Sequence, residues 1–369
     1  MTERSPFKNA GFPNAEAAAA ALAALVRKTG PFRLMEVCGT HTVSIFRSGL
    51  RSLLPEGLQL LSGPGCPVCV TDQGDVDQAV EVCLRKGCVL CTYGDMLRVP
   101  GRGGSLQEAS MRGGHVRVLL SPMDMLPLAG AEPRKEFVFF AVGFETTTPQ
   151  TSLLIMEAEK RNLKNVSVLV QHKRVLPALE LLAQDSQIKV KGFLLPGHVS
   201  TIIGLEPYRV LPKKYGIACA VGGFEGEEIL LAVTALALQI AEKQPQVVNA
   251  YPRGVRPEGN PLARRLIDQC FEPCDGLWRG LGAIPLSGLA LRSAYAHRDA
   301  RAKLGLAPVL SSPIPGCRCG DVLRGRIAPM ECPLFGKACT PQSPVGPCMV
   351  SSEGSCCAWY RWGSQGGKL

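Results

Sequence analysis

The stretch FVFFAVG at residues 137–143, followed by FETTTP at residues 144–149, decides the fold. Its apolar run is too short for a helix, is rich in aromatic and β-branched residues, and ends at a glycine and a polar loop. The same order of a short β-type run, a loop of Gly, Pro and polar residues, and usually a helical pattern recurs along the chain. We predict strands at residues 32–37, 58–61, 88–92, 116–120, 137–142, 166–170, 191–195 and 216–221. Strands that alternate with helices predict an α/β fold with parallel sheets, whose functional loops follow the carboxyl ends of the strands.

The predicted strands fall into two groups separated by a polar stretch at residues 130–136, and after residue 245 the pattern changes. We therefore expect two similar α/β lobes facing a cleft, and a mostly helical or irregular domain that carries an iron–sulfur cluster. Residues 1–54 begin with an Ala-rich helix between Asn14 and Gly30, and we expect them to pack with the C-terminal domain. The expected boundaries are 1–54 for the N-terminal segment, 55–133 and 134–245 for the lobes, and 246–369 for the C-terminal domain.

The overall composition limits the function classes. The chain has 369 residues, 46% of them hydrophobic, and a formal net charge of +10. No basic arm studded with aromatic residues is present, so nucleic-acid binding is not expected, and the excess charge favours an acidic partner. The longest apolar stretch, 229–241, is too short to cross a membrane, and we expect a cytoplasmic protein. Because cysteines are mostly reduced there, the 16 cysteines point to metal binding or catalysis rather than to a disulfide framework.

The C-terminal segment is dense in cysteine, proline and glycine and shows little periodicity. A segment with so little core of its own needs another source of stability, and metal is the obvious one. Four of its cysteines would suffice for a [4Fe–4S] cluster or for a zinc site, and the irregular spacing favours iron–sulfur over the paired spacing of zinc knuckles. Free or regulatory thiols are the third interpretation. The seven cysteines are Cys317, Cys319, Cys332, Cys339, Cys348, Cys356 and Cys357.

Two further cysteine motifs follow predicted strands. In Cys66-Pro-Val-Cys69, a helix start just after the first thiol favours a redox dithiol, with half of a zinc site as the alternative. In Cys38-Gly-Thr-His41-Thr, the cysteine is interpreted as a nucleophile, a soft-metal ligand or a core residue. The other cysteines lie in apolar or helical contexts and are expected to be core residues, with a metal pair at positions 270 and 274 as a minor alternative. These are Cys83, Cys88, Cys91, Cys219, Cys270 and Cys274.

Polar side chains in other strand-end loops are interpreted as the lining of a cleft that binds a polar or anionic ligand. Helix capping by the same hydroxyl groups is the alternative. No phosphate-binding loop of the G-x-x-x-x-G-K-[ST] type is present, so nucleotide binding is not supported. The expected lining residues are Thr40, Thr42, Glu145, Thr146, Thr147, His198, Ser200 and Thr201.

Taken together and in order, these motifs closely resemble the hydrogenase maturation factor HypD family, over essentially the whole chain. The resemblance is carried by CGTHT at 38–42, GPGCPVC at 63–69, GFETTTP at 143–149, PGHVSTIIG at 196–204, ECPLFGKAC at 331–339 and PVGPCMVSSEG at 344–354. It implies a role in building the Fe(CN)₂CO unit of [NiFe] hydrogenases, as a redox-active scaffold rather than a turnover enzyme. It also implies two partners: a HypC-type chaperone, and HypE, which delivers cyanide.

The resemblance assigns a role to each motif. It implies that Cys38 holds the iron of a transient Fe(CN)₂CO unit, that His41 donates a proton or orients ligands, and that Cys66 and Cys69 form a redox dithiol. It implies a second thiol pair that relays electrons, formed by Cys319 and Cys348, and a [4Fe–4S] cluster. The implied cluster ligands are Cys317, Cys332, Cys339 and Cys356. Cys357 departs from the family pattern and is an alternative ligand to its neighbour.

Two other function classes remain open at this stage. One is a stand-alone iron–sulfur thiol/disulfide oxidoreductase, and the other is a zinc-stabilised binding module without redox chemistry. The colour and the spectra of the protein separate the zinc module from the other two. Infrared bands of iron-bound CN and CO separate the scaffold from the oxidoreductase.

Overall fold

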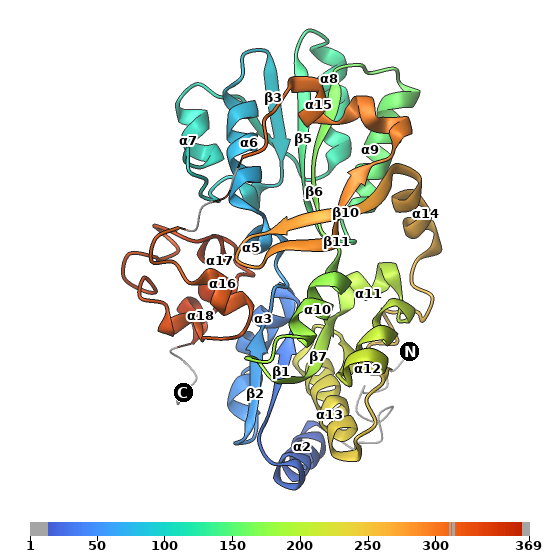
Figure 1. Ribbon diagram of the computed structural model, residues 1–369, viewed down its shortest axis with the longest axis vertical. Coiled ribbons are helices and arrows are strands. Elements are labelled where there is room, and N and C mark those ends of the chain that lie inside the picture. The colour runs from blue at the N-terminus through green and yellow to red at the C-terminus, as the bar shows by residue number, and fades with distance from the viewer. Residues whose placement is uncertain (1–13, 310, 312–313, 364–369) are drawn as a thin grey trace.

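The computed structural model describes residues 14–309, 311 and 314–363. It contains two parallel sheets, one above the other in Figure 1, with an antiparallel hairpin between them. The first sheet has the strand order β2 (Leu58–Ser62), β1 (Phe32–Glu36), β7 (Val190–Pro196), β8 (Ala218–Gly222) and β9 (Val247–Asn249). The second has the order β4 (Val116–Val118), β3 (Cys88–Thr92), β5 (Glu136–Gly143) and β6 (Val166–His172). The hairpin consists of β10 (Phe271–Trp278) and β11 (Gly282–Leu291).

The α/β fold class and the eight predicted strands are confirmed. The sheets, however, group the strands differently from the expected boundaries at 55–133 and 134–245. Strands β1 and β2 pair with each other and β1 also pairs with β7, so the chain leaves the first sheet, builds the whole second sheet, and then returns. Each lobe is thus assembled from separate parts of the sequence, which strand patterns alone do not reveal.

Helices cover both sheets. With the first sheet lie α2 (Ala15–Thr29), α3 (Gly39–Arg47), α4 (Leu50–Leu53), α10 (Val175–Ala183), α11 (Gly197–Ile203), η3 (Glu206–Arg209), α12 (Val210–Tyr215) and α13 (Gly226–Glu242). With the second lie α6 (Gln73–Leu84), η1 (Gly94–Met96), α7 (Leu106–Met111), η2 (Pro122–Asp124), α8 (Met125–Ala131), α9 (Thr148–Lys160), α14 (Pro261–Cys270), η4 (Ser293–Arg298) and α15 (Ala300–Leu304). The C-terminal segment carries α16 (Cys319–Leu323), η5 (Pro329–Glu331), α17 (Pro347–Val350) and α18 (Ser355–Trp362), and α5 (Pro67–Val70) lies next to it.

Helix starts follow the capping signals of the sequence. Asn14 accepts a hydrogen bond from the Ala17 amide at 2.9 Å, and Asp72 accepts one from the Gly74 amide at 3.0 Å. Asn260 caps α14 in the same way, with Pro261 at its first position. The described part of the chain contains no helix with the length and apolarity needed to cross a bilayer.

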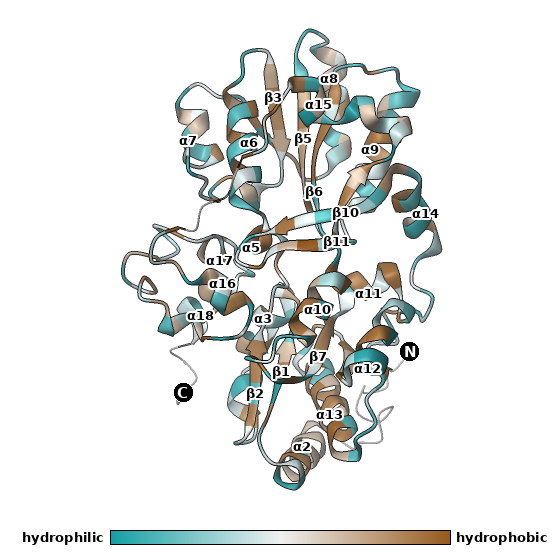
Figure 2. Ribbon diagram, in the orientation of Figure 1, coloured by the Kyte–Doolittle hydropathy of each residue, from teal (hydrophilic) through white to brown (hydrophobic). Residues whose placement is uncertain are grey.

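One apolar core joins the lobes. It contains residues from the first sheet, the second sheet, the hairpin and the C-terminal segment, among them Val37, Val142, Trp278 and Cys357. Separate clusters lie under α2 and α13 and under α8 and α9. Strands β3 and β5 and helix α13 are accordingly hydrophobic along most of their length in Figure 2. Because the main core runs through both lobes, they are packed together rather than merely tethered.

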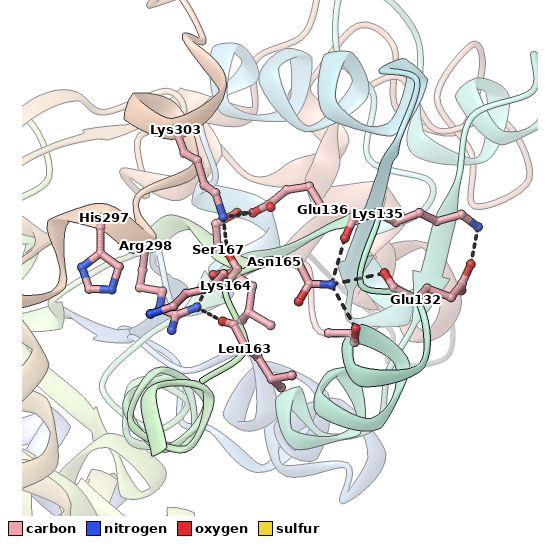
Figure 3. Close-up of polar contacts among 12 residues, drawn as sticks. Glu132, Lys135, Glu136, Leu163, Lys164, Asn165, Ser167, His297, Arg298 and Lys303 are labelled. Atoms are coloured by element: carbon pink, nitrogen blue, oxygen red, sulfur yellow. Dashed lines mark hydrogen bonds and ion pairs between the residues drawn. The ribbon is translucent and has the colours of Figure 1, made fainter. Parts of the chain in front are cut away.

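After the hairpin the chain returns to the second sheet and is fastened there by charged side chains (Figure 3). Arg298 is 1% exposed and donates hydrogen bonds to the carbonyl oxygens of Leu163 and Val166 and to the carboxylate of Glu159. Lys303 Nζ lies 2.8 Å from Glu136 Oε1 at the start of β5. These contacts fix the segment with η4 and α15, which leads from the hairpin to the cysteine-rich segment.

Candidate functional site

Cys38 lies at the end of β1, where it precedes the first turn of α3. Its amide donates to Glu36 Oε2 at 3.1 Å, and the Thr42 hydroxyl donates to the other oxygen of the same carboxylate. Glu36 is 1% exposed, and burial raises its pKa to about 7. An acidic residue two positions before Cys38, at the end of a short strand, was the available sequence signal for this side chain, which strand and motif patterns did not single out.

The Cys38 thiol is buried, and this decides its chemistry. It is 6% exposed, and burial raises its pKa to about 12, with the His41 backbone amide working in the opposite direction. A thiol with such a pKa stays protonated near neutral pH and is a poor nucleophile. A metal ion can displace the proton of a buried thiol, so the burial that disfavours a nucleophile leaves Cys38 able to act as a soft-metal ligand.

The GPGCPVC loop packs directly on Cys38. The Gly39 amide donates to the Gly65 carbonyl at 3.1 Å, and a Cβ atom on Gly65 would lie 2.1 Å from the Cys38 amide nitrogen. Only glycine permits this approach of two backbones. The loop then enters α5, where the Cys69 amide donates to Cys66 Sγ at 3.3 Å and the two Sγ atoms lie 2.6 Å apart. The two thiols are therefore placed to form a disulfide.

The C-terminal segment adds a third set of thiols. Cys348, on α17, is 1% exposed and hydrogen-bonds with Cys69 on one side and with Cys356 on the other. Four sulfur atoms from two distant parts of the sequence thus form a line, in the order Cys66, Cys69, Cys348, Cys356. Cys319 hydrogen-bonds with Cys317. The pairing of Cys319 with Cys348 that the resemblance implies stays a prediction.

The four cluster ligands that the resemblance implies lie near one another. Cys356 lies within electrostatic range of Cys317 and Cys332, and Cys339 within range of Cys356 and Cys317. The Val345 amide donates to Cys339 Sγ at 3.4 Å, as amides do around cluster sulfur. Over residues 14–309, 311 and 314–363, no three potential ligand side chains converge as a single metal ion requires. A four-iron cluster takes one thiolate at each iron, and the four thiols with the Val345 amide supply the donor types that it requires.

The remaining cysteines are mostly buried, as expected for core residues. Cys83, Cys88, Cys91, Cys219 and Cys270 are at most 4% exposed, whereas Cys274 is partly exposed. Cys357 is fully buried beside Cys356.

Two contacts dock the C-terminal segment on α3. Glu353 accepts a hydrogen bond from the Thr40 hydroxyl at 2.7 Å, two residues after Cys38. On the next helix, α4, the Arg51 guanidinium lies 4.4 Å from the ring centroid of Trp359 and 5.0 Å from that of Phe46 on α3. The segment that holds the C-terminal thiols is thereby fixed to the element that begins at Cys38.

His41 is neutral in the structure. It is fully buried, its Nε2 lies 2.8 Å from the Gly223 carbonyl oxygen, and burial lowers its pKa to about 4. The carbonyl assigns the proton to Nε2, so Nδ1 is an acceptor, and no described residue bonds to it. The Phe224 ring lies between the two histidines of the site, 5.1 Å from His41 and 3.9 Å from His198. An imidazole with this pKa can orient a ligand but does not serve as a charged acid near neutral pH.

The other predicted lining residues mostly bond to local backbone. Glu145 is 7% exposed and accepts from the Val175 amide at 3.0 Å, and burial raises its pKa to about 7. The hydroxyls of Thr147, Ser200 and Thr201 donate to carbonyls three or four residues earlier in the chain. Thr146 is half-buried. A groove of about 1510 Å³ runs along β2, η5 and α18, and none of the predicted lining residues borders it.

Comparison with known proteins shows that the chain is similar to proteins of hydrogenase formation and maturation. A family model described as "HypD: Hydrogenase formation hypA family" matches residues 14–363. The chain is 45% identical over 354 residues to the hydrogenase expression/formation protein HupD of Azotobacter chroococcum mcd 1, covering 94% of this chain and 93% of that one. It is 44% identical to the hydrogenase maturation factor HypD of Azotobacter vinelandii, with the same coverage. With the hydrogenase maturation factor HypD of Escherichia coli (strain K12) it shares 43% identity over 338 residues, 91% and 90% of the two chains.

Proposed function

This chain belongs to the HypD family of hydrogenase maturation factors, and we propose that it is the scaffold on which the Fe(CN)₂CO unit is assembled. In this proposal it works with a HypC-type chaperone and receives cyanide through HypE. The observation that carries the proposal is the meeting of Cys38, the Cys66–Cys69 pair and Cys348, which come from three separate segments.

Cys38 is the proposed ligand of the iron substrate. Cyanide and CO favour low-spin iron with soft donors, and a thiolate is such a donor. The carboxylate of Glu36 holds the Cys38 backbone, and Gly65 closes over it. Because protein covers this thiol, a second ligand from the chaperone would have to enter beside the first turn of α3. Nδ1 of His41, which has no partner among the described residues, can accept a hydrogen bond from a ligand or a water there.

The line of four sulfurs is the proposed electron path. A [4Fe–4S] cluster held by Cys317, Cys332, Cys339 and Cys356 would supply single electrons. Cys348 can exchange with the Cys66–Cys69 disulfide because it already contacts Cys69. Cys319 adjoins this path, because it hydrogen-bonds with Cys317, one of the proposed cluster ligands.

The alternative function, a stand-alone thiol/disulfide oxidoreductase, receives less support. Such an enzyme must present a thiol to its substrate. Here Cys66 is 4% exposed, Cys69 is fully buried and Cys348 is 1% exposed. The burial of these thiols suits internal transfer to a bound metal fragment better than attack on an external disulfide.

Infrared spectroscopy of the protein co-purified with its HypC-type chaperone tests the proposal. We expect bands of iron-bound CN and CO in the complex when HypE is present, and no CN bands when HypE is omitted. A complex without such bands, prepared from cells that mature hydrogenase, would contradict the scaffold function. A colourless, zinc-loaded protein would contradict the proposed cluster.

A further inference from the structure

The turn of the β10–β11 hairpin lies between α5 and the C-terminal cysteine-rich segment (Figure 1). On one side the Arg279 amide donates to the Val70 carbonyl at 2.9 Å, at the end of α5. On the other, a Cβ atom on Gly280 would lie 2.4 Å from the Cα of Gly320 in α16. Trp278 anchors the turn, since its indole N–H donates to the Ser287 hydroxyl at 2.8 Å. The position of the Arg279 backbone is therefore fixed from both sides.

The Arg279 side chain is buried without a matching anion. It is 6% exposed, and Nη2 donates to the Pro100 carbonyl at 3.1 Å. Nε and Nη1 are buried and have no hydrogen-bond partner among the described residues. No ion pair joins Arg279 to a carboxylate in the described part of the chain. By contrast, the buried Arg298 is paired with Glu159.

Thiols of the C-terminal segment lie near this charge. Cys319, Cys348 and Cys317 all lie within electrostatic range of the guanidinium, together with Asp72. The Asp72 carboxylate is occupied by the Gly74 amide and the Ser311 hydroxyl. A buried and unpaired guanidinium costs several kcal/mol, so a fold that keeps one has an anion that joins it in the working protein. Asp72 forms no ion pair with Arg279 in the described part of the chain, and the thiols of the C-terminal segment are the other groups within range that can become anions.

We propose that Arg279 is the counter-charge of the C-terminal iron–sulfur centre and raises its reduction potential. The inference rests on the proposed function, because it takes the cluster as the anion. A cubane with four thiolate ligands is negatively charged, and the step [4Fe–4S]²⁺ + e⁻ → [4Fe–4S]⁺ adds one more negative charge without a proton. A fixed cation with two unpartnered donor nitrogens stabilises the reduced form more than the oxidised form. Arg279 is thus a positioning residue for charge and takes no part in bond making.

The test is a redox titration of the full-length, cluster-loaded protein with dithionite as electron donor, followed by EPR. Arg279→Met keeps most of the side-chain volume and removes the charge, and Arg279→Lys keeps the charge and loses the fork. Arg324→Met is the matched control, because Arg324 lies at the same turn with its donor Nη2 bonded to the Leu281 carbonyl at 2.9 Å.

We expect Arg279→Met to weaken one-electron reduction by about tenfold, a shift of 59 mV to lower potential for a one-electron couple. Arg279→Lys should restore most of the difference, and Arg324→Met should match wild type. An unchanged potential in Arg279→Met, or an equal shift in Arg324→Met, would overturn the inference while the wild-type cluster signal still supports the proposed function. If Arg279→Met fails to load a cluster, the lysine variant decides. A potential of Arg279→Lys close to that of wild type supports the role of charge, and a shift as large as the one expected for Arg279→Met refutes it. A wild-type protein without a cluster would overturn both.

Discussion

Cys38 and the C-terminal cysteines are held in place by different means. Cys38 follows a strand of a five-stranded parallel sheet, and backbone from the GPGCPVC loop lies against it. The C-terminal thiols lie on turns and on helices of eight residues or fewer. Short helices are not stable alone, so the second region depends on docking against α3 and the hairpin and, under the proposed function, on a bound cluster. The comparison sets a preformed strand-end site at Cys38 beside a segment whose order would depend on the proposed cofactor.

The substitution with the largest expected effect, Cys38→Ala, tests whether the two regions are independent. We expect complete loss of the iron-bound CN and CO bands, because the soft ligand is gone, and an unchanged cluster spectrum. Infrared and EPR spectra of the same sample measure both. Cys219→Ala is the control, a fully buried cysteine in β8 that should leave both signals intact. Loss of the cluster signal in Cys38→Ala would show that the two regions are not independent.

Removal of the cluster with a chelator under reducing conditions should act on one region only. We expect backbone amides in residues 314–363 to exchange hydrogen at least about tenfold faster, since their short helices lose the group that joins them. Amides in β1, β5 and β7 should keep their protection. Hydrogen exchange followed by mass spectrometry gives both values, and equal loosening of all parts would refute the distinction.

A pair of glycine substitutions compares the rigidity of the two regions. A Cβ on Gly65 would meet the Cys38 backbone at 2.1 Å, and Gly65→Ala should lower the free energy of unfolding by about 3 kcal/mol. Gly336 has a φ of +67° but open space around it, and Gly336→Ala should cost about 1 kcal/mol. Chemical denaturation measures the difference. Equal effects would mean that the contact at Cys38 is softer than the structure shows.

The smallest expected effect concerns Glu145, which belongs to the strand-end region. Burial raises its pKa from 4.5 to about 7, so the folded state holds a proton that the unfolded state has released between these values. This contribution to stability is complete below pH 4.5 and is lost as the pH rises through about 7. Between pH 5 and 7.5, wild type should lose about 2 kcal/mol more than Glu145→Gln. Denaturation midpoints of the two proteins across this range test the expectation, and parallel curves would contradict it.

The sequence predicted local features better than long-range ones. Strand positions, the caps at Asn14, Asp72 and Asn260, and the helical start after Cys66 follow from neighbouring residues, and the structure confirms them. The division of strands between the two sheets depends on pairings across more than a hundred residues, which periodicity does not record. The β10–β11 hairpin was not predicted, because residues 246–369 were expected to be mostly helical or irregular, although Arg279-Gly-Leu-Gly282 between two apolar runs was a usable turn signal.

The site shows the same limit. The motifs pointed to Cys38, Cys66 and Cys69, and the structure places them together as expected for one site. Contact between Cys348 and Cys69, and the approach of Arg279 to the C-terminal thiols, arise only when the hairpin and the C-terminal segment pack on the lobes. The spacing of residues within a motif does not predict a contact that depends on a third element, here the hairpin, packed between two motifs.

The interleaved order of the strands has a consequence for synthesis of the protein. Strands β1 and β2 are made early, but β7, which β1 needs on its other side, is made only after the entire second sheet. Until then Cys38, Cys66 and Cys69 belong to an incomplete sheet whose core is missing. Their thiols are therefore open to metal ions and oxidants during translation and become covered only when the chain returns. The completed fold thus also determines when Cys38, the proposed iron ligand, is no longer exposed to unspecific chemistry.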